Sequence, residues 1–223
     1  MTIETLYNSL LPWYETTLPV SKIKVFFTPF KVKDSKNIAI ILKEQNKQLA
    51  LNALVNLVKN NSKELDVESL CLADAEYLYL KIRSKSVGEE IQLKINEEAA
   101  KIHIDEIKVR NSIFSDSIVL QNGINLIVKT PKIKDLLEIN LDDEHALFKK
   151  YIKAISVNKE LYELNKFVPE EIQKIIENLP YSCIESIKQI SKKQPELYVS
   201  VKLKDGEREV SGTLSFFTLL QTF

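Results

Sequence analysis

The feature that most constrains the fold is a change in the apolar period at Gly88. Between residues 70 and 82, apolar residues recur every three or four positions, as they do along one face of a helix. Between residues 91 and 95 they alternate with polar residues, as in a strand with one buried face. We therefore predict a helix over about residues 67–86 that turns directly into a β-sheet.

This corner can be interpreted as a phosphate-binding turn or as a structural helix end. Phosphate is bound at the positive N-terminus of a helix, whereas this stretch ends one. Lys81, Arg83 and Lys85 suit the negative end of the helix dipole, and Gly88 suits a left-handed cap. The pattern favours the structural interpretation.

The N-terminal part predicts one strand and two further helices. In the strand, Lys22–Phe30, Val25 and Phe27 would point to one side. Asp34 is a candidate N-cap for a helix that continues through Leu42. Apolar residues at helical spacing predict the second helix over about residues 49–58.

The central part predicts antiparallel strands. A two-residue rhythm continues from Ile91 to Val109, and two short strands flank Asn122-Gly123, a dipeptide that favours a two-residue hairpin loop. We expect these strands to form an antiparallel meander.

The C-terminal part predicts helices and a last hairpin. Helices are expected over about 142–165, 168–180 and 181–193, and Asp205-Gly206 is a candidate type I′ turn. A two-residue loop there would set three pairs opposite each other: Val201 and Val210, Lys202 and Glu209, and Lys204 and Glu207.

The predicted fold class is α+β, with an N-terminal strand and helices, a central antiparallel meander, and C-terminal helices with a terminal β-hairpin. We expect two regions: 1–131, with the strand, the helices and the sheet, and 132–223, with the C-terminal helices and the hairpin.

Composition and charge exclude several classes of protein. The chain has 223 residues and equal numbers of acidic and basic side chains, so a nucleic acid is disfavoured as its main partner. No signal peptide or membrane span is predicted, because the first residues lack a basic region and the apolar runs are shorter than about 18 residues. Cys71 and Cys183 are expected to be buried, reduced thiols in a cytosolic protein.

The sequence contains no recognised catalytic or cofactor motif. Its four glycines form no dinucleotide loop, phosphate loop or nucleophile elbow. The segment LDDEHALF, Leu141–Phe148, places His145 beside three acids, but consecutive acids point in different directions, so an acid-rich helix start is favoured over a metal site. His103 is expected on the polar face of a strand. We assign no catalytic, metal or cofactor residue and expect no cofactor.

The C-terminal segment has two interpretations. Phe216, Leu219, Leu220 and Phe223 fall at helical spacing. The stripe can pack on its own domain, or it can dock in the groove of a partner protein. We keep these four residues as candidate partner-binding residues.

Three parts of the chain resemble the baseplate hub subunit family of T-even-type contractile-tailed bacteriophages. They are TLPVSKIKVFFTPFKVKDSKNI (Thr17–Ile38), DAEYLYLKIRSKSVGEEIQL (Asp74–Leu93), and the order of the later segments, from IHIDEIKV through IVLQNGINLIVKTP to a terminal hairpin ending in FF. The second is the most specific.

The resemblance implies a non-enzymatic protein needed to assemble the central hub of the phage baseplate, either as a hub component or as an assembly chaperone. Its partners would be other hub and tail proteins, met in the host bacterial cytoplasm or kept in the virion tail. The alternatives are a cell-wall-degrading hub enzyme, which would need paired carboxylates across a cleft, and a generic structural module.

Overall fold

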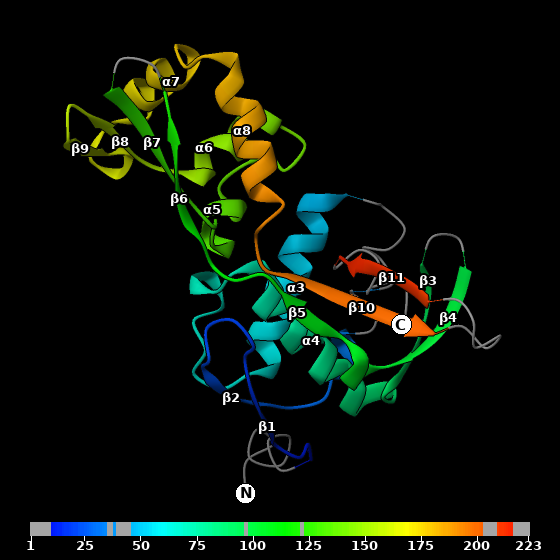
Figure 1. Cartoon of the computed structure of the whole chain (residues 1–223). Helices are drawn as coiled ribbons and strands as arrows, with labels where there is room; N and C mark the ends of the chain where they lie inside the picture. Colours follow the sequence, from blue (N-terminus) through cyan, green and yellow to red (C-terminus); the bar gives the residue numbers. More distant parts are fainter. Residues whose placement is uncertain are drawn as a thin grey trace, which may run out of the picture. The chain divides into compact units, whose positions relative to one another are not determined.

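The computed structural model (Figure 1) describes residues 10–34, 38, 46–95, 98–120, 123–202 and 209–215. The chain divides into two compact units: unit 1 is Met1–Arg110 with Glu196–Phe223, and unit 2 is residues 111–195. Unit 2 is thus an insertion between two parts of unit 1. The boundary expected at residue 131 falls inside unit 2.

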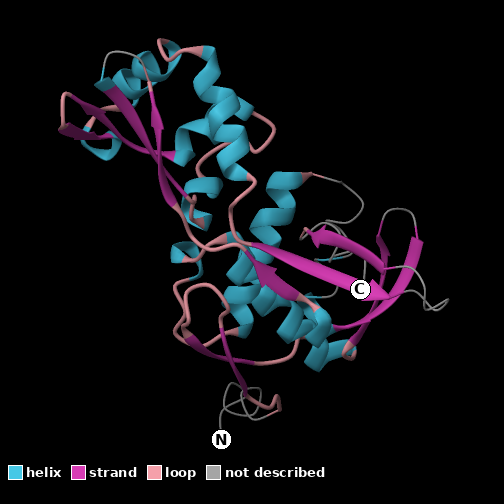
Figure 2. Cartoon of the chain, in the orientation of Figure 1, coloured by secondary structure: helices cyan, strands magenta, loops and turns pink. Residues whose placement is uncertain are grey.

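The described residues of unit 1 include two long helices and three small antiparallel sheets (Figure 2). The long helices are α3 (Lys47–Asn61) and α4 (Leu72–Val87), and the 3-10 turns are η1 (Val67–Ser69) and η2 (Ile104–Glu106). Its strands are β1 (Tyr14–Thr17), β2 (Lys24–Phe27), β3 (Glu90–Ile95), β4 (Glu98–His103), β5 (Lys108–Arg110), β10 (Glu196–Lys202) and β11 (Glu209–Leu214). The sheets are β1-β2, β3-β4 and β11-β10-β5.

Unit 1 is built from two separate stretches of the chain because β5 pairs with β10. Arg110 lies opposite Glu196 in this antiparallel ladder, and their side chains form an ion pair. Leu197 and Val199 of β10 are fully buried, and β10 contacts α4. The centre is therefore not one continuous meander, because β5 leaves its sequence neighbour β4 to pair with a strand 86 residues later.

The predicted helix before Gly88 is confirmed as α4, the best-buried helix of unit 1, with η1 as a separate turn before it. Gly88 ends it with φ +114° and ψ 164°, a conformation essentially restricted to glycine but outside the left-handed helical region that we expected. Arg83 is buried, and its Nη1 donates to the carbonyl oxygens of Gly88 (3.0 Å) and Glu90 (3.4 Å). The corner is thus held by a buried guanidinium.

Helix α4 also fixes the N-terminal ribbon formed by β1 and β2. The carboxylate of Asp74, which is fully buried, accepts hydrogen bonds from the backbone N–H groups of Val20 and Ser21, both at 2.8 Å. Near the other end of α4, the hydroxyl of Ser86 accepts from the N–H of Phe30 at 2.8 Å. The two contacts anchor the turn between the strands and the segment that follows them.

The predicted N-terminal strand is confirmed, but the helix start at Asp34 is wrong. Val25 and Phe27 of β2 are buried and the alternate residues Lys24 and Phe26 are exposed, as expected. The chain is already helical from Val32, and the Asp34 carboxylate reaches back to the N–H of Lys31 at 2.9 Å. Asp34 therefore acts as an acid inside the first turn and not as the N-cap.

The described part of unit 2 has one four-stranded antiparallel sheet and four α-helices. The sheet order is β6 (Ser115–Val119), β7 (Ile124–Lys129), β8 (Ile152–Val157) and β9 (Glu160–Glu163). The helices are α5 (Ile133–Leu137), α6 (Glu144–Tyr151), α7 (Pro169–Glu177) and α8 (Tyr181–Ser191), and η4 (Leu164–Lys166) is a 3-10 turn. A core of apolar residues from β6, β7, β8, α6 and α8 joins the sheet to these helices.

Two local predictions in unit 2 are corrected. The helix expected over 142–165 ends at Tyr151, and the rest forms β8 and β9, joined by Asn158 and Lys159 at φ 51° and 73°. The hairpin around Asn122-Gly123 is confirmed, but the Leu120 N–H donates to the Ile124 carbonyl at 2.7 Å, which leaves three residues in the loop instead of two. Gly123, at φ +73°, is the left-handed residue that such loops use.

The terminal hairpin has the predicted register. Val201 lies opposite Val210 and Lys202 opposite Glu209. The turn at Asp205-Gly206 and the pair Lys204 and Glu207 lie outside the described residues. The α+β fold class is confirmed.

Replacement of Asp74 by alanine should lower the free energy of unfolding by about 2–4 kcal/mol, because two backbone N–H groups lose their acceptor. Chemical denaturation measures the loss. Asp66→Ala is the matched control, since the Asp66 side chain is exposed and makes no capping bond, and should change the value by less than about 0.5 kcal/mol. Equal effects of the two substitutions would contradict the anchoring role of Asp74.

A fragment of residues 111–195 should fold by itself. Its two ends are tied by its own contacts, because the Asn111 side chain donates to the carbonyl oxygens of Lys192 (3.4 Å) and Gln194 (3.1 Å). A fragment of residues 132–223 should not fold, since it separates β8 from β6 and β7. Circular dichroism and thermal melts of both fragments test the division, and the opposite result would support the boundary expected at 131.

Candidate partner-binding groove

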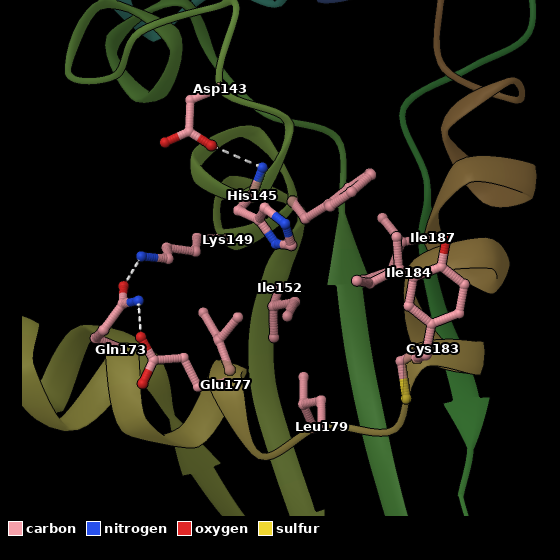
Figure 3. Close-up of a pocket in the computed structure, with 13 residues that line it drawn as sticks. Asp143, His145, Lys149, Ile152, Gln173, Glu177, Leu179, Cys183, Ile184 and Ile187 are labelled. Carbon is pink, nitrogen blue, oxygen red and sulfur yellow. Dashed lines mark hydrogen bonds between the residues drawn. The ribbon is translucent and has the colours of Figure 1, made fainter.

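A groove of about 500 Å³ opens in unit 2 between α6, β8, α7 and α8 (Figure 3). Apolar side chains form most of its lining: Phe148, Ile152, Ile176, Leu179, Cys183, Ile184 and Ile187. Polar side chains complete it: Asp143, His145, Lys149, Gln173, Glu177 and Tyr181. We call this feature the unit 2 groove.

Helix α7 leaves the groove open because it buries its apolar face only partly. Ile172, Ile175 and Ile176 lie on one face at helical spacing and pack against the core, yet no residue of α7 is fully buried. On α8, Cys183 and Ile187 are buried while Ile184 is half-buried. Apolar surface thus stays accessible between two helices that are otherwise part of the core.

The polar rim of the groove is occupied by internal hydrogen bonds. Asp143 caps α6, and its carboxylate accepts from the N–H groups of His145 (2.9 Å) and Ala146 (3.1 Å). Lys149 donates to Gln173, which in turn donates to Glu177, so this chain of contacts joins α6 to α7 (Figure 3). The predicted acid-rich helix start is confirmed at Asp143 and Glu144.

The groove contains a cysteine and a histidine, but their arrangement is not that of a nucleophile and its base. Cys183 is almost completely buried, and burial raises the pKa of its thiol. Among the described residues, no hydrogen bond joins Cys183 to His145. A protonated, buried thiol is a poor nucleophile, so the groove favours apolar binding over covalent catalysis.

The other residues considered in the sequence analysis form no candidate site in the described part of the chain. His103 ends β4 with its side chain 42% exposed and lies 3.4 Å from Glu89 and 3.5 Å from Asp105. Within the residues that the structure describes, no group of three or more histidine, cysteine or acidic side chains could hold a metal ion. Phe216, Leu219, Leu220 and Phe223 lie outside the described residues.

The unit 2 groove was not predicted from the sequence, although part of its signal is present there. Ile172, Ile175, Ile176 and Leu179 have helical spacing on a short segment, which predicts an apolar face. The spacing does not show that the face is only half covered.

None of the described helices combines the length and the apolar character needed to cross a bilayer.

Both thiols should be unreactive in the native protein. Burial raises the pKa of Cys71 to about 11 and also raises the pKa of Cys183. With a disulfide reagent at about pH 8, we expect slow reaction in buffer and rapid release of two equivalents in concentrated guanidinium chloride. One rapidly reacting equivalent in the native protein would contradict this expectation and reopen cysteine catalysis.

A family model described as T4 bacteriophage base plate protein matches residues 11–219 of the chain. No curated protein and no solved structure matches. The match spans both units and includes the whole Asp74–Leu93 segment, whose residues form α4 and its corner with β3. The chain belongs to the T4 bacteriophage base plate protein family.

Proposed function

We propose that this protein acts without catalysis in the assembly of the central hub of the phage baseplate, as a hub component or as an assembly chaperone. The match to the base plate family over residues 11–219 carries the proposal. The resemblance of Asp74–Leu93 to the hub subunits points to the hub among the parts of the baseplate.

The unit 2 groove is the surface that suits such a role best. Its floor is apolar, and charged side chains along its rim already make hydrogen bonds, Asp143 with backbone N–H groups and Lys149 and Glu177 with the amide of Gln173. An amphipathic helix that lays an apolar face into a hydrophobic groove needs this arrangement. We propose that the occupant is an amphipathic segment of another baseplate protein.

The C-terminal segment is proposed as a second contact. Phe216, Leu219, Leu220 and Phe223 have the spacing of a docking helix and include two aromatic anchors. Deletion of residues 216–223 tests this contact. If the shortened protein folds normally and still binds every partner, the segment has no docking role.

The proposed place of action is the host cytoplasm during assembly and, for a hub component, the tail of the finished virion. Mass spectrometry of purified virions separates the two forms of the proposal. A component remains in the particle at a fixed ratio, whereas an assembly chaperone is absent from it.

A tagged chain should co-purify with at least one hub protein when the two are co-expressed. Ile184→Lys, which places a charge in the groove, should weaken that binding by at least about tenfold. Ile113→Lys is the control, since Ile113 is also in unit 2, is 56% exposed and does not line the groove. A knockout phage without any tail defect, or a chain with muramidase turnover, would overturn the proposed function.

A further inference from the structure

The outer edge of strand β1 has main-chain groups that can accept another strand. On the far side of β2, the Thr28 N–H donates to the Asn61 carbonyl (2.8 Å) and the Lys63 N–H donates to the Phe26 carbonyl (3.0 Å). The backbone N–H and C=O groups of Phe26 and Thr28 therefore point away from β1. Because the direction of these groups alternates along a strand, those of Val25 and Phe27 point toward β1.

The register then shows which groups of β1 face outward. Tyr14 lies opposite Phe27 and Thr16 opposite Val25, so these two residues carry the bonds to β2. The N–H and C=O groups of Trp13, Glu15 and Thr17 face the other side. In the part of the chain that the structure describes, none of these groups makes a hydrogen bond.

The face beside this edge is apolar and electrically neutral. Trp13 and Phe26 are 51% and 44% exposed, so two large aromatic side chains are accessible beside the edge. Within the described strands β1 and β2, the charged side chains are Glu15 and Lys24, which form an ion pair at 2.9 Å, and the Lys24 ammonium lies 5.6 Å from the centre of the Phe26 ring. A partner that pairs along β1 therefore meets aromatic surface and a charge pair that is already neutralised.

The ribbon is also held in place before any partner arrives. On its inner face, the rings of Tyr14 and Phe27 lie 5.8 Å apart, and the Lys85 ammonium lies 5.5 Å from the centre of the Tyr14 ring. The carboxylate of Asp74 fixes the turn. A preformed edge reduces the entropy that a partner strand must lose on binding.

We propose that β1 is a strand-addition site, where an extended segment of another baseplate protein pairs with Trp13, Glu15 and Thr17. The segment has apolar side chains toward Trp13 and Phe26 and no net charge. A second copy of this chain fits less well, because antiparallel overlap of two Trp13–Thr17 segments sets Glu15 opposite Glu15. The identity of the partner class rests on the proposed function, but the site is separate from the unit 2 groove.

The experiment uses the full chain with 5-fluorotryptophan at Trp13, the only tryptophan. Baseplate proteins of the same phage, purified one at a time, are added while the fluorine resonance and the exchange of the backbone amides are followed. We expect one of them to shift the resonance and to protect the amides of Glu15 and Thr17.

Two substitutions at one position separate the main-chain edge from the side chain. Glu15→Pro removes an outward N–H and leaves the bonds to β2 intact, so it should weaken binding by at least about tenfold. Glu15→Ala keeps the N–H and should weaken binding by less than about threefold. Unchanged melting temperatures of both variants show that the fold is preserved.

Each other outcome overturns the inference. A baseplate protein that binds without affecting Trp13 or these amides leaves the proposed function intact and refutes strand addition. Equal loss of binding in the two Glu15 variants refutes a main-chain contact. Protection of Glu15 in the chain alone assigns the edge to residues 1–9 if sedimentation shows a monomer, or to a second copy if it shows a dimer. If no baseplate protein binds, the proposed function fails as well.

Discussion

The structure of unit 1 depends on the buried carboxylate of Asp74. Among the described residues, no cation forms an ion pair with it. Asp74 is compensated by two backbone N–H groups from a turn 53 and 54 residues earlier in the chain. A buried anion is tolerated only when its hydrogen bonds are satisfied, so the position of the turn and the position of α4 determine each other. At the other end of the same helix, Arg83 satisfies carbonyl oxygens of the corner with β3. One helix thus fixes the parts of unit 1 that precede and follow it, and this helix lies within the region that matches the base plate family.

The surfaces proposed for binding have a common physical origin, because each is an element that the local fold leaves incomplete. Helix α7 covers the core of unit 2 only with half-buried isoleucines, so a groove remains. Among the described strands, β1 is paired on one side only. In both places nearby charged side chains already bond to other groups of the same unit. The surface left for a partner therefore consists of apolar side chains in the groove and of backbone N–H and C=O groups at β1. Proteins that function by assembly need such surfaces, and in the free protein the same surfaces favour nonspecific association.

Local patterns predicted most elements, whereas pairing over long distances was not predictable. The helical period before Gly88, the alternation in β2 and the register of the last hairpin depend on neighbouring residues, and the structure has them as expected. The turn at Asn158 and Lys159 was missed because its second position lacks the glycine that marks a type I′ turn. Nothing in the short segment Lys108–Arg110 indicates that it pairs with Glu196–Tyr198, so the inserted unit could not be recognised. The groove was missed because spacing predicts an apolar face but does not predict how much of it is covered.

The insertion of unit 2 also determines the order in which the chain can fold during synthesis. Domains usually fold as units from the N-terminus onward. Here unit 2 has all its strands once residue 195 has been made, while unit 1 still lacks β10, the middle strand of its three-stranded sheet. Until β10 emerges, α4 has no cover for the surface that Leu197 and Val199 later occupy. Unit 2 is therefore made second but can complete its core first. The first 110 residues keep apolar surface exposed until the strand Glu196–Lys202 has been made.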